Sequence, residues 1–180
     1  MPILVTIAAG LISWSFLEYA LHHWLGHLGQ GRNPFSKEHL RHHARSDYFS
    51  PLSRKLSLAL PVLSGLALLT WPLVGWPLSS LYAASVGIGW IAYEGLHYRL
   101  HHAAPRNAWG RYLRRHHFHH HFHQPFLNHG VTSPIWDLCF GTKHRVSAAI
   151  QVPRAQALPW LLDAQQEIKP EFARDYQLRG

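Results

Sequence analysis

Residues 2–25 read PILVTIAAGLISWSFLEYALHHWL, and this stretch decides the class of fold. A helix needs about 20 mainly apolar residues to cross the hydrocarbon core of a bilayer. The stretch contains one acid, Glu18, and no basic residue, and no small-residue cleavage site followed by a polar chain ends it. Because a removed signal peptide has a basic start and such a site, we interpret residues 2–25 as a membrane span, with a tilted or partly interfacial helix as the alternative.

Two further apolar stretches, residues 56–76 and 78–96, are also long enough to cross a membrane. The dipeptide Trp76-Pro77 lies between them and predicts a tight turn. We therefore expect the second and third spans to form a helical hairpin. Together the three spans predict an all-α, integral membrane helical bundle.

The charges of the chain lie in blocks. All 17 Lys and Arg residues fall within residues 32–55 or from residue 99 onward, and the apolar stretches carry only the acids Glu18 and Glu94. The positive-inside rule places both basic regions in the cytoplasm, and the N-terminus on the other side. Despite a net charge of +8, we expect no nucleic-acid partner, because no recognition motif accompanies the charge.

Composition excludes several classes of protein. Charged residues make up 14% of the 180 residues, which is too few for a charge-rich disordered chain. Cys139 is the only cysteine, so the chain is no disulfide scaffold. Only nine acids serve the whole chain, whereas histidine occurs 17 times. A metal site built from imidazoles is therefore expected rather than one built from carboxylates.

Ten of the histidines form four motifs with the spacing of metal ligands. Positions i, i+3 and i+4 share one helical face, so a motif of three histidines can direct three imidazoles to one point. His22 and His27 are five residues apart and converge only if they straddle a site or if the helix end is distorted. The four motifs are His22-x4-His27, His39-x2-His42-His43, His97-x3-His101 and His117-x2-His120-His121.

Ten ligands predict two metal ions, because one tetrahedral site uses about four. Imidazole suits Fe, Zn, Cu and Ni. A structural pair of zinc ions is one alternative, but a redox dimetal centre explains the number of ligands better. We expect this centre to form a cytosolic, histidine-lined dimetal cap on the helical bundle.

Three acids and one further histidine are expected to orient these ligands. A charged carboxylate near membrane depth is costly and usually has a partner, and metal-bound imidazoles commonly donate their second N–H to a carboxylate. Glu18 precedes His22 by four residues, and Glu94 precedes His97 by three. We assign the same role to His116 and to Asp137, for which capping of a local turn is the alternative.

The motifs, in this order and spacing, resemble the fatty acid hydroxylase/sterol desaturase superfamily, and most closely the fatty acid 2-hydroxylases. The resemblance covers roughly residues 15–145. It rests on Glu18-Tyr19-Ala20-Leu21-His22-x4-His27, His39-x2-His42-His43, Tyr93-Glu94-x2-His97-Tyr98-x2-His101, His116-His117-x2-His120-His121-Phe122 and Gly130-Val131-Thr132-Ser133-x2-Trp136-Asp137-x2-Phe140-Gly141-Thr142.

The resemblance implies a membrane non-haem di-iron enzyme that hydroxylates or desaturates a lipid with O2 and two electrons, and we expect hydroxylation of the acyl chain of a fatty acid or lipid. Zinc can take the place of iron in purified protein. The implied partners are a lipid or fatty acyl substrate and a separate electron donor, which is cytochrome b5-like, a ferredoxin or a reductase. A fused cytochrome b5 domain is not expected, because the chain has no His-Pro-Gly-Gly motif.

Two alternatives stay open. A sterol or carotenoid hydroxylase or desaturase would use the same dimetal site. A non-catalytic metal-binding membrane protein, such as a transporter or a structural zinc protein, would belong to another class. The histidines gather at one face of the predicted bundle, which disfavours a conduction path through the membrane.

The chain divides into a hydroxylase-like domain, residues 1–150, and an amphipathic C-terminal tail, residues 151–180. Apolar residues over 157–168 predict a surface helix that is broken near Pro170. This helix would lie on the lipid headgroups or pack onto the core. Five arginines are candidates for binding a lipid headgroup, a carboxylate or an acidic electron-transfer partner, namely Arg99, Arg106, Arg111, Arg114 and Arg115.

Overall fold

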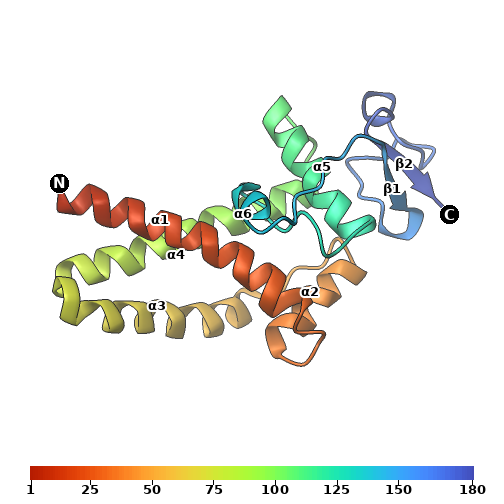
Figure 1. The fold of residues 1–180 in the computed structure, drawn as a ribbon. Coiled ribbons are helices and arrows are strands. Elements are labelled where there is room, and N and C mark those ends of the chain that lie inside the picture. The colour runs from red at the N-terminus through yellow and green to blue at the C-terminus, as the bar shows by residue number, and fades with distance from the viewer. The chain divides into compact units, whose positions relative to one another are not determined.

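The computed structural model describes all 180 residues and is mostly helical (Figure 1). The chain forms two compact units. Unit 1 comprises residues 1–18 and 50–95, and unit 2 comprises residues 19–49 and 96–180. In chain order the elements are α1 (Pro2–Ala20), the π-helix η1 (Leu21–His27), α2 (Pro34–Ala44), α3 (Leu52–Val74), α4 (Trp76–His102), α5 (Ala108–Phe122), α6 (Ile135–Cys139), β1 (Ile150–Pro153), the 3-10 helices η2 (Arg154–Gln156) and η3 (Pro170–Phe172), and β2 (Tyr176–Arg179).

Unit 1 consists of most of α1, all of α3 and the larger part of α4 (Figure 1). Glycines let α1 and α4 approach closely. A Cβ atom on Gly10 would lie 2.5 Å from the Cβ of Ser85, and one on Gly89 would lie 2.7 Å from the Cβ of Trp14. Small residues at such contacts are typical of packed membrane helices, because they let the two backbones come together.

The predicted helical hairpin is present. Helix α3 ends at Val74, and α4 begins at Trp76. The turn lies at Gly75, whose φ of 77° lies in the left-handed region that glycine tolerates, and Trp76-Pro77, where the sequence predicted the turn, instead begin α4. Thr70 and Ser79 join the two helices through a hydrogen bond of 3.0 Å between their hydroxyl groups.

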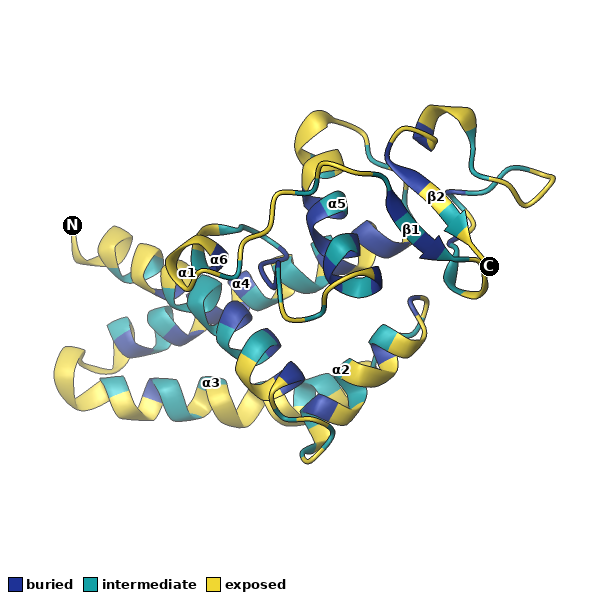
Figure 2. Cartoon of the chain, turned by 45° about the vertical axis from the view of Figure 1, so that its right-hand side comes forward, coloured by how far each residue is buried: buried dark blue, intermediate teal, exposed yellow.

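Two helical segments are long and apolar enough to cross a membrane, Pro2–His27 and Leu52–Val74. Large apolar side chains of α3, such as Leu69 and Leu73, are exposed, and Figure 2 colours much of this helix as exposed. Such exposure suits a helix that faces lipid rather than the core of a water-soluble domain. Helix α4, which contains the predicted span 78–96, is not among the helices that combine the length and the hydropathy of a membrane span. A third crossing therefore stays a prediction.

We expect Gly89→Ala to weaken the contact between α1 and α4. The new methyl group would overlap the Cβ of Trp14, an atom that cannot move without the backbone. Overpacking of this kind costs about 1–3 kcal/mol. The matched control is Gly65→Ala in α3, where a Cβ atom meets nothing within 4 Å. Denaturation of both variants in micelles measures the difference, and equal stability of the two would contradict the close packing at Gly89.

Unit 2 has a hydrophobic core in which α5 packs against the C-terminal segment. Phe118 and Phe122 of α5 contact buried apolar residues of the chain beyond residue 149. The parallel strands β1 and β2 pair from Ile150 with Tyr176 to Pro153 with Arg179. Their presence corrects the all-α prediction in this part of the chain.

The predicted surface helix over 157–168 is not formed, and turns, loops and an isolated antiparallel bridge between Leu162 and Ile168 occupy this region instead. Pro159 interrupts the apolar run and cannot donate the main-chain hydrogen bond that a helix interior needs. Leu158 and Leu161 are buried in the core of unit 2. Of the two roles considered for this segment, core packing is therefore confirmed for these leucines.

Candidate metal centre

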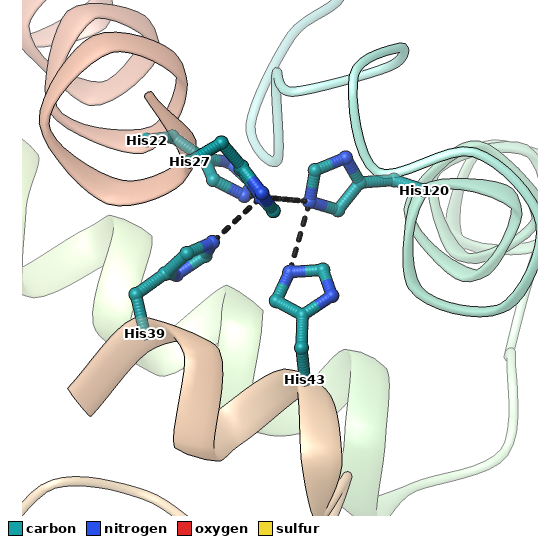
Figure 3. A group of neighbouring side chains, drawn as sticks. All are labelled: His22, His27, His39, His43 and His120. Carbon is teal, nitrogen blue, oxygen red and sulfur yellow. Dashed lines mark hydrogen bonds between the residues drawn. The ribbon is translucent and has the colours of Figure 1, made fainter. Parts of the chain in front are cut away.

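Unit 2 gathers the ten histidines of the four motifs into two groups of five. Within each group the imidazole nitrogens that could bind a metal lie within 4.8 Å of one another. Cluster A, drawn in Figure 3, consists of His22, His27, His39, His43 and His120. Cluster B consists of His42, His97, His101, His117 and His121.

The three-histidine motifs of α2 and α5 each divide between the two clusters. Helix α2 gives the two histidines that are four residues apart to cluster A and the remaining one, His42, to cluster B. Helix α5 gives His117 and His121, which are four residues apart, to cluster B and the remaining one, His120, to cluster A. Each cluster thus receives two pairs and one single imidazole.

The prediction that the three imidazoles of one motif meet at one point is therefore wrong. On an α-helix, positions i and i+4 are about 40° apart around the axis, whereas i+3 and i+4 are about 100° apart. Two side chains separated by 100° can serve two adjacent sites. One helix can consequently supply ligands to both clusters.

His22 and His27 reach the same cluster because α1 continues into the π-helix η1 (Leu21–His27). Main-chain hydrogen bonds in a π-helix span five residues, so side chains five positions apart come to nearly the same side. The two ring centroids are 5.4 Å apart. Their Nε2 atoms lie 2.8 Å and 3.0 Å from Nε2 of His120. The π-helix is therefore the distorted helix end that the five-residue spacing of His22 and His27 required.

The junction between η1 and α2 is tightly built. Ser36 donates its hydroxyl hydrogen to the carbonyl of Gly26 at 2.5 Å. Asn33 caps α2 by accepting a hydrogen bond from the main-chain N–H of Ser36 at 2.8 Å. A Cβ atom on Gly26 would lie 2.9 Å from Cδ2 of His39. The missing side chain at Gly26 therefore makes room for one imidazole of cluster A.

We expect Gly26→Ala to lower the metal affinity of cluster A, because the new methyl group would push the ring of His39 out of place. Changes that misorient a metal-binding side chain cost about 10–100-fold in affinity. The control is Gly95→Ala, two residues before His97, where a Cβ atom meets nothing within 4 Å. Competition with a chromophoric chelator measures both variants. Unchanged metal affinity in Gly26→Ala would contradict this account of the junction.

Main-chain carbonyls fix the orientation of three imidazoles. A carbonyl can only accept, so the ring nitrogen facing it must carry the hydrogen. The Nδ1–H of His22 donates to the carbonyl of His129 at 2.5 Å, and that of His120 donates to Leu127 at 2.8 Å. In cluster B, the Nδ1–H of His42 donates to Tyr48 at 2.7 Å. In the neutral form, the Nε2 atom of each of these rings therefore carries the lone pair.

These lone pairs test whether the clusters suit a metal. Nε2 of His22 and Nε2 of His120 are 2.8 Å apart, and two lone pairs cannot form a hydrogen bond with each other. A cation between them would turn the repulsion into coordination. In cluster B, His121 is buried and neither ring nitrogen has a hydrogen-bond partner. The converging lone pairs fit a metal ion in cluster A. The unpartnered imidazole fits a metal ion in cluster B.

Burial favours the neutral form of five imidazoles in the two clusters. It lowers the pKa of His39, His43 and His120 in cluster A well below the usual value, and the neighbouring imidazoles lower it further. The same causes, in the same order, lower the pKa of His117 and His121 in cluster B. Neutral imidazole is the form that binds a metal.

The two clusters are neighbours. The ring of His43 in cluster A stacks on that of His121 in cluster B, with centroids 4.1 Å apart and an interplanar angle of 6°. The rings of His117 and His120, from the two clusters, have centroids 6.1 Å apart. Two metal ions held here would therefore lie side by side in one centre.

Asp137 organises the chain beside cluster A. Its carboxylate accepts hydrogen bonds from the main-chain N–H groups of His129 and Gly130, both at 2.8 Å, and from the hydroxyl of Thr142 at 2.7 Å. It also accepts from Nε2 of His116 at 3.1 Å. Burial alone would raise the pKa of Asp137, but these hydrogen bonds hold it well below its usual value. Asp137 thus fixes the main chain at His129, whose carbonyl orients His22.

The other two acids have different surroundings. Glu94 forms an ion pair with Lys55 and accepts a hydrogen bond of 3.3 Å from Nε1 of Trp90. Its action on His97 stays a prediction. Glu18 is buried, but the Nδ1–H of His22 is bound to the carbonyl of His129. That carbonyl therefore takes the orienting role toward His22 that the sequence assigned to Glu18.

The orienting carbonyls of Tyr48, Leu127 and His129 could not be found from the sequence. Every residue has a carbonyl, so no residue type marks one that binds an imidazole. Gly26 offered a weak signal, because a glycine inside the first histidine motif suggests close approach of another segment.

Comparisons with known proteins agree with this architecture. A family model described as fatty acid hydroxylase matches residues 7–142. The chain therefore belongs to the fatty acid hydroxylase family, as its histidine motifs predicted. The dihydroceramide fatty acyl 2-hydroxylase FAH2 of Arabidopsis thaliana is 29% identical over 153 residues, which cover 79% of this chain and 62% of that protein. The ceramide very long chain fatty acid hydroxylase SCS7 of Saccharomyces cerevisiae is 29% identical over 142 residues, covering 74% and 36%.

A solved structure also has a similar fold. It is described as full-length scs7p with only the hydroxylase domain visible, and it matches with a TM-score of 0.66 and 25% sequence identity. The match covers 83% of this chain and 59% of that one. The chain thus spans about 60% of the length of its plant relatives and less of the yeast protein.

Proposed function

We propose that this chain is a membrane oxygenase that hydroxylates the acyl chain of a fatty acid or lipid at a centre of two iron ions. The observation that carries the proposal is the pair of adjacent five-imidazole clusters, with lone pairs converging in cluster A and an unpartnered imidazole in cluster B. Membership of the fatty acid hydroxylase family supports the reaction, and relatives named as acyl 2-hydroxylases support the substrate class.

The reaction consumes one O2, two electrons and two protons. One oxygen atom enters the substrate as a hydroxyl group, the other leaves as water, and the C–H bond is replaced by C–O. No side chain acting as acid, base or nucleophile can attack an unactivated C–H bond, so iron would supply the reactive oxygen chemistry when bound. The two electrons must come from a separate donor.

The chain's own residues hold and orient the centre. His22, His27, His39, His43 and His120 would bind one ion, and the five histidines of cluster B would bind the other. The carbonyls of His129, Leu127 and Tyr48 hold the donor nitrogens in place. Such anchoring keeps the metal-binding side chains preorganised.

The apolar helices support a membrane location and a lipid substrate. The exposed apolar side chains of α1 and α3 suit contact with the acyl chains of a bilayer. We place the clusters on the cytoplasmic face, because the basic blocks of the chain begin at residues 32 and 99. The protein would then be a multi-pass membrane protein.

A sterol or carotenoid oxygenase is the second candidate, because the same centre could serve it. Lipid profiling of a host that expresses the chain separates the two. We expect hydroxylated acyl chains with the wild-type protein and none with His121→Ala, which removes the unpartnered imidazole of cluster B. His102→Ala is the control, because His102 is exposed and outside both clusters. Oxidised sterols or carotenoids without hydroxylated acyl chains would overturn the acyl substrate.

A further inference from the structure

A cationic cavity of about 1010 Å³ lies beside α5 in unit 2. Its charged walls come from the loop before α5, from α5 itself and from the chain after α6. Buried His116 also lines it. The cationic side chains of the cavity are Arg106, Arg111, Arg115, Lys143 and Arg145.

The cavity keeps an excess of positive charge. Glu171 is the one acid in its wall, and Asp175 pairs with Arg111 and Arg115. Five cations against these two acids leave three positive charges in excess. Lys143 and Arg145 are exposed and form no ion pair, so their charges are available to a partner.

Not every arginine of this region belongs to the cationic surface. Arg114 is buried, and its guanidinium donates to the carbonyls of Leu100 at 2.8 Å and Arg99 at 3.0 Å. It thereby binds carbonyls in the last turn of α4, as cations at helix C-termini do. Burial lowers the pKa of Arg114 to about 10. Its role is structural, in contrast to the ligand-binding role considered from the sequence.

Helix α5 separates the cavity from the metal centre. Arg111 and Arg115, one turn apart, line the cavity, whereas His117, His120 and His121 belong to the clusters. At about 100° per residue, these two sets occupy different faces of the helix. A molecule bound in the cavity would be one helix away from the clusters, too far to be the group that is oxidised.

His116 connects the cavity to both clusters. One peptide bond joins it to His117 of cluster B. Its Nε2 donates to Asp137, which accepts the N–H of His129, whose carbonyl in turn accepts from His22 of cluster A. A short path of covalent and hydrogen bonds therefore leads from the floor of the cavity to each cluster.

We propose that this cavity is the docking site of an acidic, soluble one-electron carrier protein. This inference rests on the proposed oxygenase function, since hydroxylation requires two electrons per O2 and each docked carrier delivers one as it is oxidised. Charge complementarity speeds the encounter of such partners, and electron-transfer complexes need only a small contact area. The cavity offers the positive charge, and His116 offers the path inward.

Charge reversal tests the proposal. The double variant Lys143→Glu/Arg145→Glu is compared with Arg32→Glu/Lys37→Glu, which changes the net charge equally at two exposed residues outside the cavity. The probe is the soluble haem domain of cytochrome b5, an acidic one-electron donor. We expect its kcat/KM in lipid hydroxylation to fall at least about tenfold in the cavity variant at low salt, with a smaller loss at high salt. The control variant should keep the wild-type value.

Two further measurements separate the possible failures. Dithionite replaces the donor protein in the first, and both variants should then form product at the wild-type rate. Product formation with dithionite, but equal donor kcat/KM in all three proteins, would overturn the docking site and leave the oxygenase function intact. No product from the wild type with dithionite would contradict the function itself. Binding to anionic lipid vesicles is the second measurement. Loss of vesicle binding by the cavity variant with unchanged donor kinetics would mark the cavity as a lipid contact and overturn the proposal.

Discussion

His120→Ala is expected to abolish hydroxylated product and to reduce the metal content of the purified protein from two ions to one. Nε2 of His120 lies within 3.1 Å of the Nε2 atoms of three other histidines of cluster A. Its ring is fixed by a hydrogen bond from Nδ1–H to the carbonyl of Leu127. No other imidazole of the cluster contacts three partners in this way, so its loss should empty cluster A first.

The neighbouring histidine supplies the control. His119 lies on the same helix but belongs to neither cluster, and its ring stacks on those of His123 and His144. We expect His119→Ala to keep both metal ions and to form product. Elemental analysis of the two purified variants, together with lipid profiling, distinguishes them. Two metal ions and normal turnover in His120→Ala would rule out the assigned role of His120.

Of the variants considered, Asp137→Ala should cause the largest loss of folding free energy. The carboxylate is fully buried and accepts hydrogen bonds from two main-chain N–H groups, a hydroxyl and an imidazole. Alanine would leave these donors buried without a partner. A buried hydrogen-bond donor that loses its partner costs about 1–3 kcal/mol, so the loss of several such bonds should cost several kcal/mol. The loop that carries His129 should loosen as well, and cluster A should lose metal affinity.

Asp47→Ala is the matched control for this change. Asp47 forms an exposed ion pair with Arg45, with 3.7 Å between Nε and Oδ1. Pairs of this kind contribute about 0–1 kcal/mol. Denaturant unfolding in micelles should therefore place Asp137→Ala several kcal/mol below the wild type and Asp47→Ala close to it. A small effect at Asp137 would mean that its hydrogen bonds are replaced by water.

The ten clustered histidines could be selected from the sequence because spacing on a helix marks them. Their distribution between two sites could not, since it depends on how α2 and α5 are rotated toward each other. The spacing of His22 and His27 required a distorted helix end, and the π-helix supplies it. Which main-chain carbonyls bind the imidazoles depends on loop conformation, which local sequence does not determine.

The C-terminal segment shows the same limit. The sequence shows its apolar residues, and their spacing suggested a helix. Pro159 interrupts this apolar run, however. The structure uses Leu158 and Leu161 to cover α5 and pairs Ile150 with Tyr176 in a short parallel sheet. Such pairing joins residues far apart in the chain, and hydropathy along the sequence carries no signal for it.

The most direct test of the central claim is hydroxylation under heavy-isotope O2. Purified protein that contains both metal ions is supplied with an acyl lipid, dithionite and labelled O2, and the product is analysed by mass spectrometry. We predict a hydroxylated acyl chain whose new hydroxyl group carries the heavy oxygen. A hydroxyl group that carries solvent oxygen, or no hydroxylated product from protein with both ions bound, would contradict a dimetal oxygenase built from clusters A and B.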